Sequence, residues 1–285
     1  MADLPQDDRA LVGEVCARLG LAGASVMALE GGTRNRSYQL ADGRQDVVLR
    51  VEGDHDGSYA VTREAEYAAQ RLASAHGLAP RLLLSAPGYA VTEFVPGAPW
   101  SRDLAASPEG SALAGAWLAR LHTLPVPADL RQVRFLSSLE AYVGQLQDAG
   151  PAQRLLESAR RVALELGDFT PVPCHNDLHH LNLIDAPAGV VAIDWEYAGA
   201  GDPRLDLAGY VAYHDLPEPA LKSLLDAYAA RRPRCARADL DRARWLFEAV
   251  WWAWLELRRQ LEGREPAAVS VLRGRLLDRL RPGAS

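Results

Sequence analysis

The chain has 285 residues, 48% of them hydrophobic and 24% charged, a composition typical of a soluble globular protein large enough for two lobes. A formal net charge of −6 argues against a general nucleic-acid binder, and no apolar run approaches the ~20 residues that a membrane-spanning helix needs. Three widely separated cysteines indicate neither a disulfide framework nor a metal site, and the acidic N-terminus is unlike a signal peptide. We therefore expect a cytoplasmic protein that binds neither nucleic acid nor membrane.

The first part of the chain alternates between helical and strand patterns. Residues 10–19 and 62–75 have helical character, and Thr62 is a candidate cap for the second helix. Five short runs rich in β-formers read as strands: residues 26–29, 37–40, 47–51, 82–84 and 89–94. Because proline and glycine punctuate the chain directly afterwards, we place a nucleotide-binding lobe at 1–95.

The second part is mostly helical. Helical spacing predicts helices in six segments: 111–124, 137–147, 152–166, 221–230, 240–261 and 267–280. A short strand over 190–193 interrupts them. A five-stranded antiparallel sheet with one main helix, followed by a larger helical lobe at 96–285, is the layout of the bilobal protein-kinase-like fold. The fold class is thus α+β, with catalysis and substrate binding expected in the second lobe.

Asp177 and Asn182 lie five positions apart, which is the spacing of a kinase catalytic loop. Phosphoryl transfer needs a carboxylate to orient and deprotonate the attacking hydroxyl, and an oxygen ligand beside it for a magnesium ion. Asp177 is the candidate base and Asn182 a candidate metal ligand. Asp194 follows the apolar 190–193 strand, where its carboxylate is the candidate main ligand of the metal that bridges the nucleotide phosphates.

This stretch has two other interpretations. His175, His179 and His180 offer a transition-metal site, but their spacing matches no zinc pattern. The second interpretation is a loop capped by the His-Asn-Asp run, in which Asn176 and Asp177 have no chemical role. The joint spacing with Asp194 favours the catalytic interpretation.

Two blocks are typical of one family: 174–182, and 193–208 with its Ile-Asp-Trp-Glu-Tyr-Ala-Gly and Gly-Asp-Pro-Arg-Leu-Asp-Leu-Ala runs. With the Gly31-Gly32 turn and the 48–50 strand, the chain resembles the aminoglycoside phosphotransferase and choline kinase superfamily. It is most similar to bacterial choline kinase-like and thiamine kinase-like members. The resemblance implies ATP and Mg²⁺ as cofactors, Asp177 as catalytic residue, and Asn182 and Asp194 as magnesium ligands. It also implies that His175 and Asp206 support the catalytic loop.

The first lobe holds candidate nucleotide-binding residues. Gly32 and Asn35 lie in a turn between two predicted strands that could cover phosphates, although such a turn is more often a simple hairpin connection. Arg50, on the third strand, is expected to meet the phosphates where most kinases have lysine, and choline kinase-like proteins resemble this chain in using arginine. Its partner is Glu66, with Glu64 as the alternative.

A hinge between the lobes is expected from Glu93 to Val95, where backbone groups would meet the adenine edge. Side-chain identity hardly constrains this role.

The acceptor pocket is expected on the C-terminal helices, where Trp251 and Trp254 share a helix face. Aromatic rings attract a desolvated cation, although core packing explains the same pattern. Glu196 and Tyr197 are further candidates for contacting a cationic head group, unless Glu196 pairs with Arg204.

The sequence thus predicts a kinase for a small cationic alcohol, with choline or ethanolamine first and thiamine second. An aminoglycoside or other small-molecule kinase and a non-catalytic nucleotide-binding regulator are the alternatives. The oligomeric state is not predicted.

Overall fold

The computed structural model describes residues 4–29, 35–53, 62–147, 150–263 and 265–280. They form two compact units: Met1–Ala98 together with Ile184–Glu196, and Pro99–Leu183 together with Tyr197–Ser285. Residues 184–196 therefore group with the N-terminal unit, whereas the sequence-based boundary left them in the second lobe; the functions assigned to the lobes stay predictions. Within the described segments, no helix has the length and apolar character that crossing a bilayer requires.

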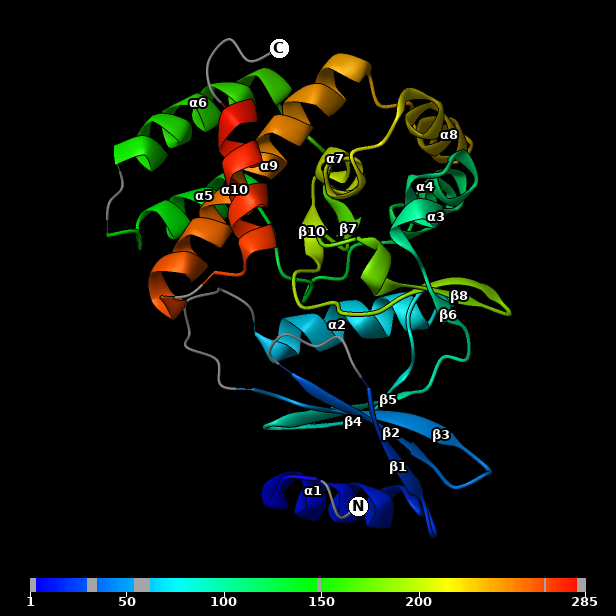
Figure 1. The fold of residues 1–285 in the computed structure, drawn as a ribbon. Coiled ribbons are helices and arrows are strands. Elements are labelled where there is room, and N and C mark those ends of the chain that lie inside the picture. Colours follow the sequence, from blue (N-terminus) through cyan, green and yellow to red (C-terminus); the bar gives the residue numbers. More distant parts are fainter. Residues whose placement is uncertain (1–3, 30–34, 54–61, 148–149, 264, 281–285) are drawn as a thin grey trace. The chain divides into compact units, whose positions relative to one another are not determined.

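The first unit is built on a five-stranded antiparallel sheet in the order β1-β2-β3-β5-β4 (Figure 1). Its strands are β1 (Ser25–Leu29), β2 (Arg36–Ala41), β3 (Asp46–Val51), β4 (Leu82–Ala86) and β5 (Tyr89–Glu93). Helix α2 (Arg63–Ser74) connects β3 to β4, and the Thr62 hydroxyl caps it by accepting from the Ala65 amide at 3.3 Å. The predicted sheet and its one intervening helix are confirmed.

The two helices of this unit lie on opposite faces of the sheet (Figure 1). Helix α1 (Gln6–Leu19) packs Val12 and Val15 into a core with the inward side chains of the strands, among them Leu49 of β3. Because side chains alternate along a strand, the neighbouring Arg50 points to the other face, where α2 lies. The alternation of side chains along β3 therefore directs Arg50, the predicted phosphate-binding residue, toward α2.

A separate small sheet has three strands in the order β6-β8-β9. It comprises β6 (Ala98–Pro99), β8 (Leu183–Ala186) and β9 (Gly189–Ala192). The predicted strand over 190–193 is thus β9, shifted by one residue. Asp194 comes two residues after β9 and has a φ of 62°, a left-handed conformation that costs energy in a non-glycine residue.

The second unit is mostly helical. Its elements are α3 (Arg102–Ala106), α4 (Pro108–Leu121), α5 (Phe135–Val143), α6 (Gly150–Leu166), β7 (Val172–Cys174), a short 3₁₀ turn (His180–Asn182), β10 (Gly199–Gly201), α7 (Pro203–His214), α8 (Glu218–Ala229), α9 (Arg237–Glu262) and α10 (Ala267–Arg279). The six predicted helices are present within a few residues of their expected bounds. Helices α3 and α7 were not predicted.

Helix α7 lies among the other helices of this unit and packs on α9 (Figure 1). Nine of its twelve residues are buried, so it lacks the polar stripe by which amphipathic helices are recognised in sequence. A Cβ on Gly209 would come within 2.6 Å of the Phe247 ring. This glycine allows α9 to approach α7 closely, which sets where the aromatic residues of α9 lie.

Candidate functional site

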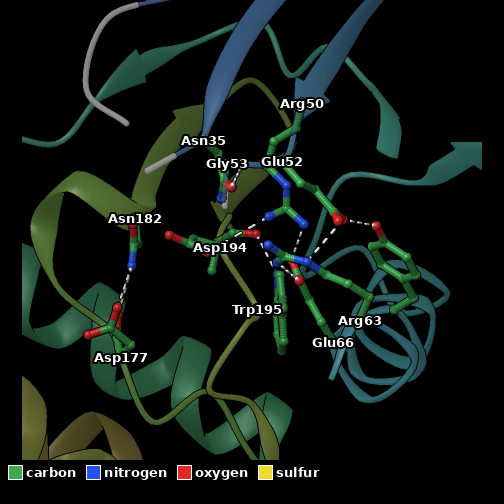
Figure 2. Close-up of polar contacts among 12 residues, drawn as sticks. Asn35, Arg50, Glu52, Gly53, Arg63, Glu66, Asp177, Asn182, Asp194 and Trp195 are labelled. Carbon is green, nitrogen blue, oxygen red and sulfur yellow. Dashed lines mark hydrogen bonds and ion pairs between the residues drawn. The ribbon is translucent and has the colours of Figure 1, made fainter. Parts of the chain in front are cut away.

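In the first unit, Arg50 is held by carboxylates from two directions (Figure 2). Its Nη2 lies 2.5 Å from Glu66 Oε1, and its Nη1 lies 3.9 Å from Asp194 Oδ1. Burial alone would lower the pKa of Arg50, but the charges of Glu66 and Asp194 outweigh it and the pKa is raised. Of the two carboxylates that the sequence offered as its partner, Glu66 is fully buried and makes the ion pair, whereas Glu64 is exposed.

Arg63 shares Glu66 with Arg50. Its Nη1 lies 2.6 Å from Glu66 Oε2, and its Nε lies 2.9 Å from Glu52 Oε1, which also accepts from the Tyr67 hydroxyl. Both oxygens of Glu66 are thus engaged by guanidinium groups. The network fixes the rotamer of Glu66 and, through it, the direction in which Arg50 projects.

Asp194 has the character of a cation ligand. Its Oδ1 is buried and, within the described segments, accepts no hydrogen bond. Burial raises the pKa of Asp194 despite the opposing charge of Arg50. A buried carboxylate oxygen without a donor is satisfied by a bound cation, so this residue suits the magnesium ion that the family resemblance implies.

Glu196 lies two residues further along the chain. Burial, followed by the charge of Asp194, raises its pKa to about 7. The sequence left open a pairing of Glu196 with Arg204. In the structure Arg204 instead forms an ion pair with Asp202 at 2.7 Å and donates to the Leu166 carbonyl at 2.7 Å. Arg204 thereby anchors the beginning of α7.

The remaining nucleotide candidates are placed less fully. Gly32 lies outside the described residues. Asn35 is described, and its Oδ1 accepts from the Gly53 amide at 3.3 Å, which ties the residue before β2 to the residues after β3 (Figure 2). Glu93 is the last residue of β5, and Val95, two positions further on, is half-buried. Their roles in binding the nucleotide stay predictions.

In the second unit, both oxygens of Asp177 have neighbours. Oδ1 accepts a hydrogen bond from the Tyr213 hydroxyl at 2.5 Å. Oδ2 lies 3.3 Å from Asn182 Nδ2 and 3.7 Å from His179 Nε2. Burial lowers the pKa of His179 to about 3, so this imidazole is neutral near pH 7 and brings no positive charge to the carboxylate.

Asn182 turns its amide nitrogen toward Asp177, donating also to the Asp177 carbonyl at 2.9 Å (Figure 2). Its amide oxygen is therefore the atom that would serve as a metal ligand, and an amide oxygen is a ligand that magnesium accepts. The five-residue spacing thus produces the side-by-side arrangement that the sequence suggested.

The loop before Asp177 is held by Asp206 from α7. The carboxylate accepts from the backbone amides of His175 and Asn176 at 2.8 and 2.6 Å. Asn176 has a φ of 65°, and its side chain donates to the Tyr197 carbonyl at 2.9 Å. Asp206 therefore stabilises a strained turn by occupying two amides that would otherwise be buried without acceptors.

Asp206 is oriented in turn by His122. The imidazole Nε2 lies 3.0 Å from Asp206 Oδ2, and Nδ1 lies 2.9 Å from the Tyr228 hydroxyl. Burial alone would raise the pKa of Asp206. The hydrogen bond from His122 and the electrostatic effects of His122 and His175 outweigh burial and hold this pKa below its usual value. Asp206 therefore stays ionised and keeps both loop amides.

The described residues contain one group with the spacing of a metal site, formed by His122, Cys174 and Asp206. Hydrogen bonds already occupy His122 and Asp206, and burial raises the pKa of Cys174 well above its usual range, which disfavours the thiolate that binds metals. The histidines at 175, 179 and 180 form no such group in the part of the chain that the structure describes. The transition-metal interpretation receives no support.

An aromatic cluster adjoins Asp177. The Tyr213 ring makes edge contacts with Trp251 at 4.7 Å and with Phe247 at 5.2 Å between centroids. Trp254, which the sequence placed on the same face, instead stacks under the Arg258 guanidinium at 4.9 Å. Of the two candidate tryptophans, Trp251 is the one that tertiary packing brings beside a neighbour of Asp177.

Three residues of this site were missed in the sequence: Arg63, His122 and Tyr213. Arg63 lies three positions before Glu66 on α2, and Tyr213 lies seven positions after Asp206 on α7, so in each case helical spacing places both residues on one face. Helical spacing identifies such neighbours only where the helix itself has been predicted, and α7 was not predicted. His122 had no local signal.

Comparison with known proteins identifies chains of similar sequence. Residues 25–246 match the model described as the phosphotransferase enzyme family. A thiamine kinase of Salmonella typhi is 34% identical over 242 residues, which cover 81% of this chain and 78% of the relative.

Solved structures give the same class of fold. A choline kinase of Streptococcus pneumoniae, 18% identical, has a TM-score of 0.80 and matches 96% of this chain and 99% of its own. An amicoumacin kinase solved with AMP-PNP, Ca²⁺ and Ami, 16% identical, has a TM-score of 0.71 and matches 96% of this chain and 93% of its own. At these identities the likeness establishes the fold alone. It confirms the α+β kinase-like fold expected from the sequence.

Proposed function

Because this chain belongs to the phosphotransferase enzyme family, we propose that it transfers the γ-phosphoryl group of ATP to the hydroxyl of a small cationic alcohol. The observation that carries the proposal is the contact between Asp177 and Asn182, with side-chain atoms 3.3 Å apart on a loop fixed by Asp206. A candidate base and a candidate magnesium ligand side by side are the minimum that phosphoryl transfer requires.

Each residue has a role in this reaction. Asp177 accepts the proton of the acceptor hydroxyl as its oxygen bonds to phosphorus and the bond from phosphorus to the leaving ADP oxygen breaks. Arg50, directed by Glu66, binds the phosphates of the nucleotide. Asn182 Oδ1 and Asp194, each described within its own unit, are the candidate ligands for magnesium, which would neutralise phosphate charge. Gly32, Asn35, Glu93 and Val95 remain candidates for the nucleotide contacts.

For the acceptor we propose thiamine first, with choline or ethanolamine second. The sequence favoured the reverse order, but the curated relatives at 34% identity are thiamine kinases. The Tyr213–Trp251 pair beside Asp177 suits either cation, because an aromatic face attracts a thiazolium or a quaternary ammonium group by roughly 0.5–2 kcal/mol. Glu196 and Tyr197 are further candidate contacts for the positive charge.

The reaction would take place in the cytoplasm, where ATP is available and where Cys16, Cys174 and Cys235, all free in this structure, stay reduced.

A panel of acceptors tests the proposal. ADP release would be measured with ATP and magnesium in the presence of thiamine, choline, ethanolamine, an aminoglycoside or no acceptor, and the phosphorylated product identified by mass spectrometry. We expect the highest kcat/KM with thiamine. Turnover with the aminoglycoside alone would exclude a cationic alcohol while sparing the kinase. Magnesium-dependent ATP binding without turnover of any acceptor would instead favour the non-catalytic regulator.

The two tryptophans provide a matched pair of variants for the pocket. Trp251→Leu should raise the KM for the acceptor by roughly 3- to 30-fold, as expected when a cation loses an aromatic face. Trp254→Leu removes the same surface from the same helix but should have a smaller effect, because its ring already binds Arg258. Equal effects on KM would place the pocket elsewhere.

A further inference from the structure

Tyr213 makes a short contact to the candidate base. Its hydroxyl lies 2.5 Å from Asp177 Oδ1, shorter than the 3.3 Å from Asn182 Nδ2 to Oδ2. The two oxygens of Asp177 are therefore unequal with respect to these two donors, because Oδ1 accepts the short hydrogen bond from a neutral hydroxyl and Oδ2 has the longer contact to the Asn182 amide. A carboxylate free to rotate would not distinguish its oxygens in this way.

The Tyr213 ring is fixed by aromatic neighbours from separate parts of the unit. Its centroid lies 5.3 Å from His179 of the catalytic loop, 5.2 Å from Phe247 and 4.7 Å from Trp251, with interplanar angles of 85°, 84° and 71°. Edge contacts with three neighbouring rings restrict the rotamers open to Tyr213. The hydroxyl is thus held in a defined place by α9 and by the loop that carries Asp177.

Tyr213 is suited to donate rather than to exchange its proton. Burial, together with the charge of Asp177, raises its pKa well above the ordinary tyrosine value. It therefore keeps its proton near pH 7 and serves as a donor to Asp177. His179 lies 3.7 Å from Oδ2, but because its imidazole is neutral it forms no ion pair with Asp177.

We propose that Tyr213 is a positioning residue that binds Asp177 Oδ1 and so presents Oδ2 to the acceptor hydroxyl. The proposal rests on the proposed function. In the transfer step the acceptor proton goes to Oδ2, the new bond joins the acceptor oxygen to phosphorus, and the bond between phosphorus and the ADP oxygen breaks. Tyr213 retains its own proton throughout.

The same contact has an opposite interpretation, in which the Tyr213 hydroxyl occupies the place of the acceptor hydroxyl and must leave before reaction. The two interpretations predict opposite effects of removing the hydroxyl. Removing a positioning hydroxyl slows the chemical step, whereas removing an obstructing one speeds it or lowers the KM for the acceptor.

Tyr213→Phe removes only the hydroxyl and keeps the ring that packs on Trp251 and Phe247. With thiamine, or the panel acceptor that the wild type uses best, we expect kcat to fall roughly 10-fold or more and the KM for ATP to stay within about 2-fold. Tyr210→Phe is the matched control, since Tyr210 is a buried tyrosine of the same helix whose hydroxyl donates to the Ala105 carbonyl at 2.8 Å. It should retain the wild-type kcat.

A thermodynamic cycle tests the hydrogen bond without any substrate. Tyr213→Phe should lower Tm in the wild-type background but change it little in an Asp177→Ala background, because the acceptor is then missing. The same Tm loss in both backgrounds would overturn the assigned contact.

The kinetic and thermal outcomes separate the two proposals. A wild type inactive with every acceptor overturns the proposed function, and the positioning role with it. An active wild type whose Tyr213→Phe variant is unchanged overturns the positioning role alone, and a faster variant overturns it in favour of obstruction.

Discussion

The two clusters of candidate residues are held together by different forces. Around Arg50, charged groups face one another, with two guanidinium groups sharing the fully buried Glu66. Around Asp177, the partners are a tyrosine hydroxyl and an asparagine amide, and the loop is fixed by backbone amides that donate to Asp206. The first cluster depends on charge balance, because removing one member leaves a buried ion without its partner. The second depends on the direction of hydrogen bonds.

The clusters nevertheless share one feature. Each contains a non-glycine residue in the left-handed region, Asp194 at a φ of 62° in the first and Asn176 at 65° in the second. Such a conformation costs of order 1–3 kcal/mol and persists only where surrounding contacts enforce it. In both units a backbone conformation that lowers stability therefore occurs at or beside a candidate site residue.

The largest effect is expected from Asp177→Asn, which keeps the shape of the side chain and removes its basicity. We expect kcat to fall by ~10²–10⁴-fold while Tm changes little, because an amide oxygen can still accept from Tyr213. The exposed Asp185→Asn is the control and should keep wild-type activity. A loss below about 3-fold in Asp177→Asn would contradict its role as base and remove the contrast between the clusters.

An intermediate effect is expected in the charged cluster from Glu66→Gln. Arg50 then loses its buried anionic partner, so the KM for ATP should rise roughly 10-fold or more and the free energy of unfolding should fall by about 3 kcal/mol. Glu64→Gln, on the exposed side of the same helix, should change neither quantity measurably. If the two variants behave alike in ATP kinetics and urea unfolding, the ion pair does not position Arg50.

The smallest effect concerns pH and the hydrogen-bonded cluster. Burial lowers the pKa of His214 to about 4, and the ring is held as a neutral imidazole that donates from Nδ1 to the Tyr210 carbonyl and accepts at Nε2 from the His180 amide. The second nitrogen of His214 binds a proton near pH 6.5 in the unfolded chain and near pH 4 in the folded protein. The contribution of the neutral ring to the free energy of unfolding is therefore fully present above pH 6.5 and is lost as the pH falls from 6.5 toward 4.

Urea unfolding at pH 7.5 and pH 5 measures this loss. We expect His214 to account for on the order of 2 kcal/mol of it, and a His214→Gln variant to show a correspondingly smaller difference between the two pH values. His76→Gln, at an exposed position, should keep the wild-type difference. An unchanged pH dependence in His214→Gln would show that this ring is not held neutral.

Much of the first unit could be predicted because its signals are local. The runs that became β1 to β5 are short, rich in β-formers and separated by turn residues, and Thr62 lies where a helix cap is needed. Helix α1 starts at Gln6 rather than residue 10, because Asp7 and Asp8 are polar residues that favour a first helical turn while adding nothing to the apolar period.

The sequence by itself determined the contacts that span a few residues. The loop over 177–182 brings Asp177 and Asn182 together over five positions. The next helix predicted after the strand of Arg50 offered Glu66 as its partner. Only the tertiary structure decided that Tyr213 reaches Asp177 across 36 positions, or that His122 orients Asp206 across 84.

It also decided between two tryptophans that the sequence could not separate. Trp251 and Trp254 have the same residue type and the same helix face, yet one lies against Tyr213 and the other under Arg258. The physical reason is that periodicity records only how a segment divides its polar and apolar sides. A helix buried nearly all round, such as α7, has no such division, and its partners are chosen by close packing such as that of Phe247 on Gly209.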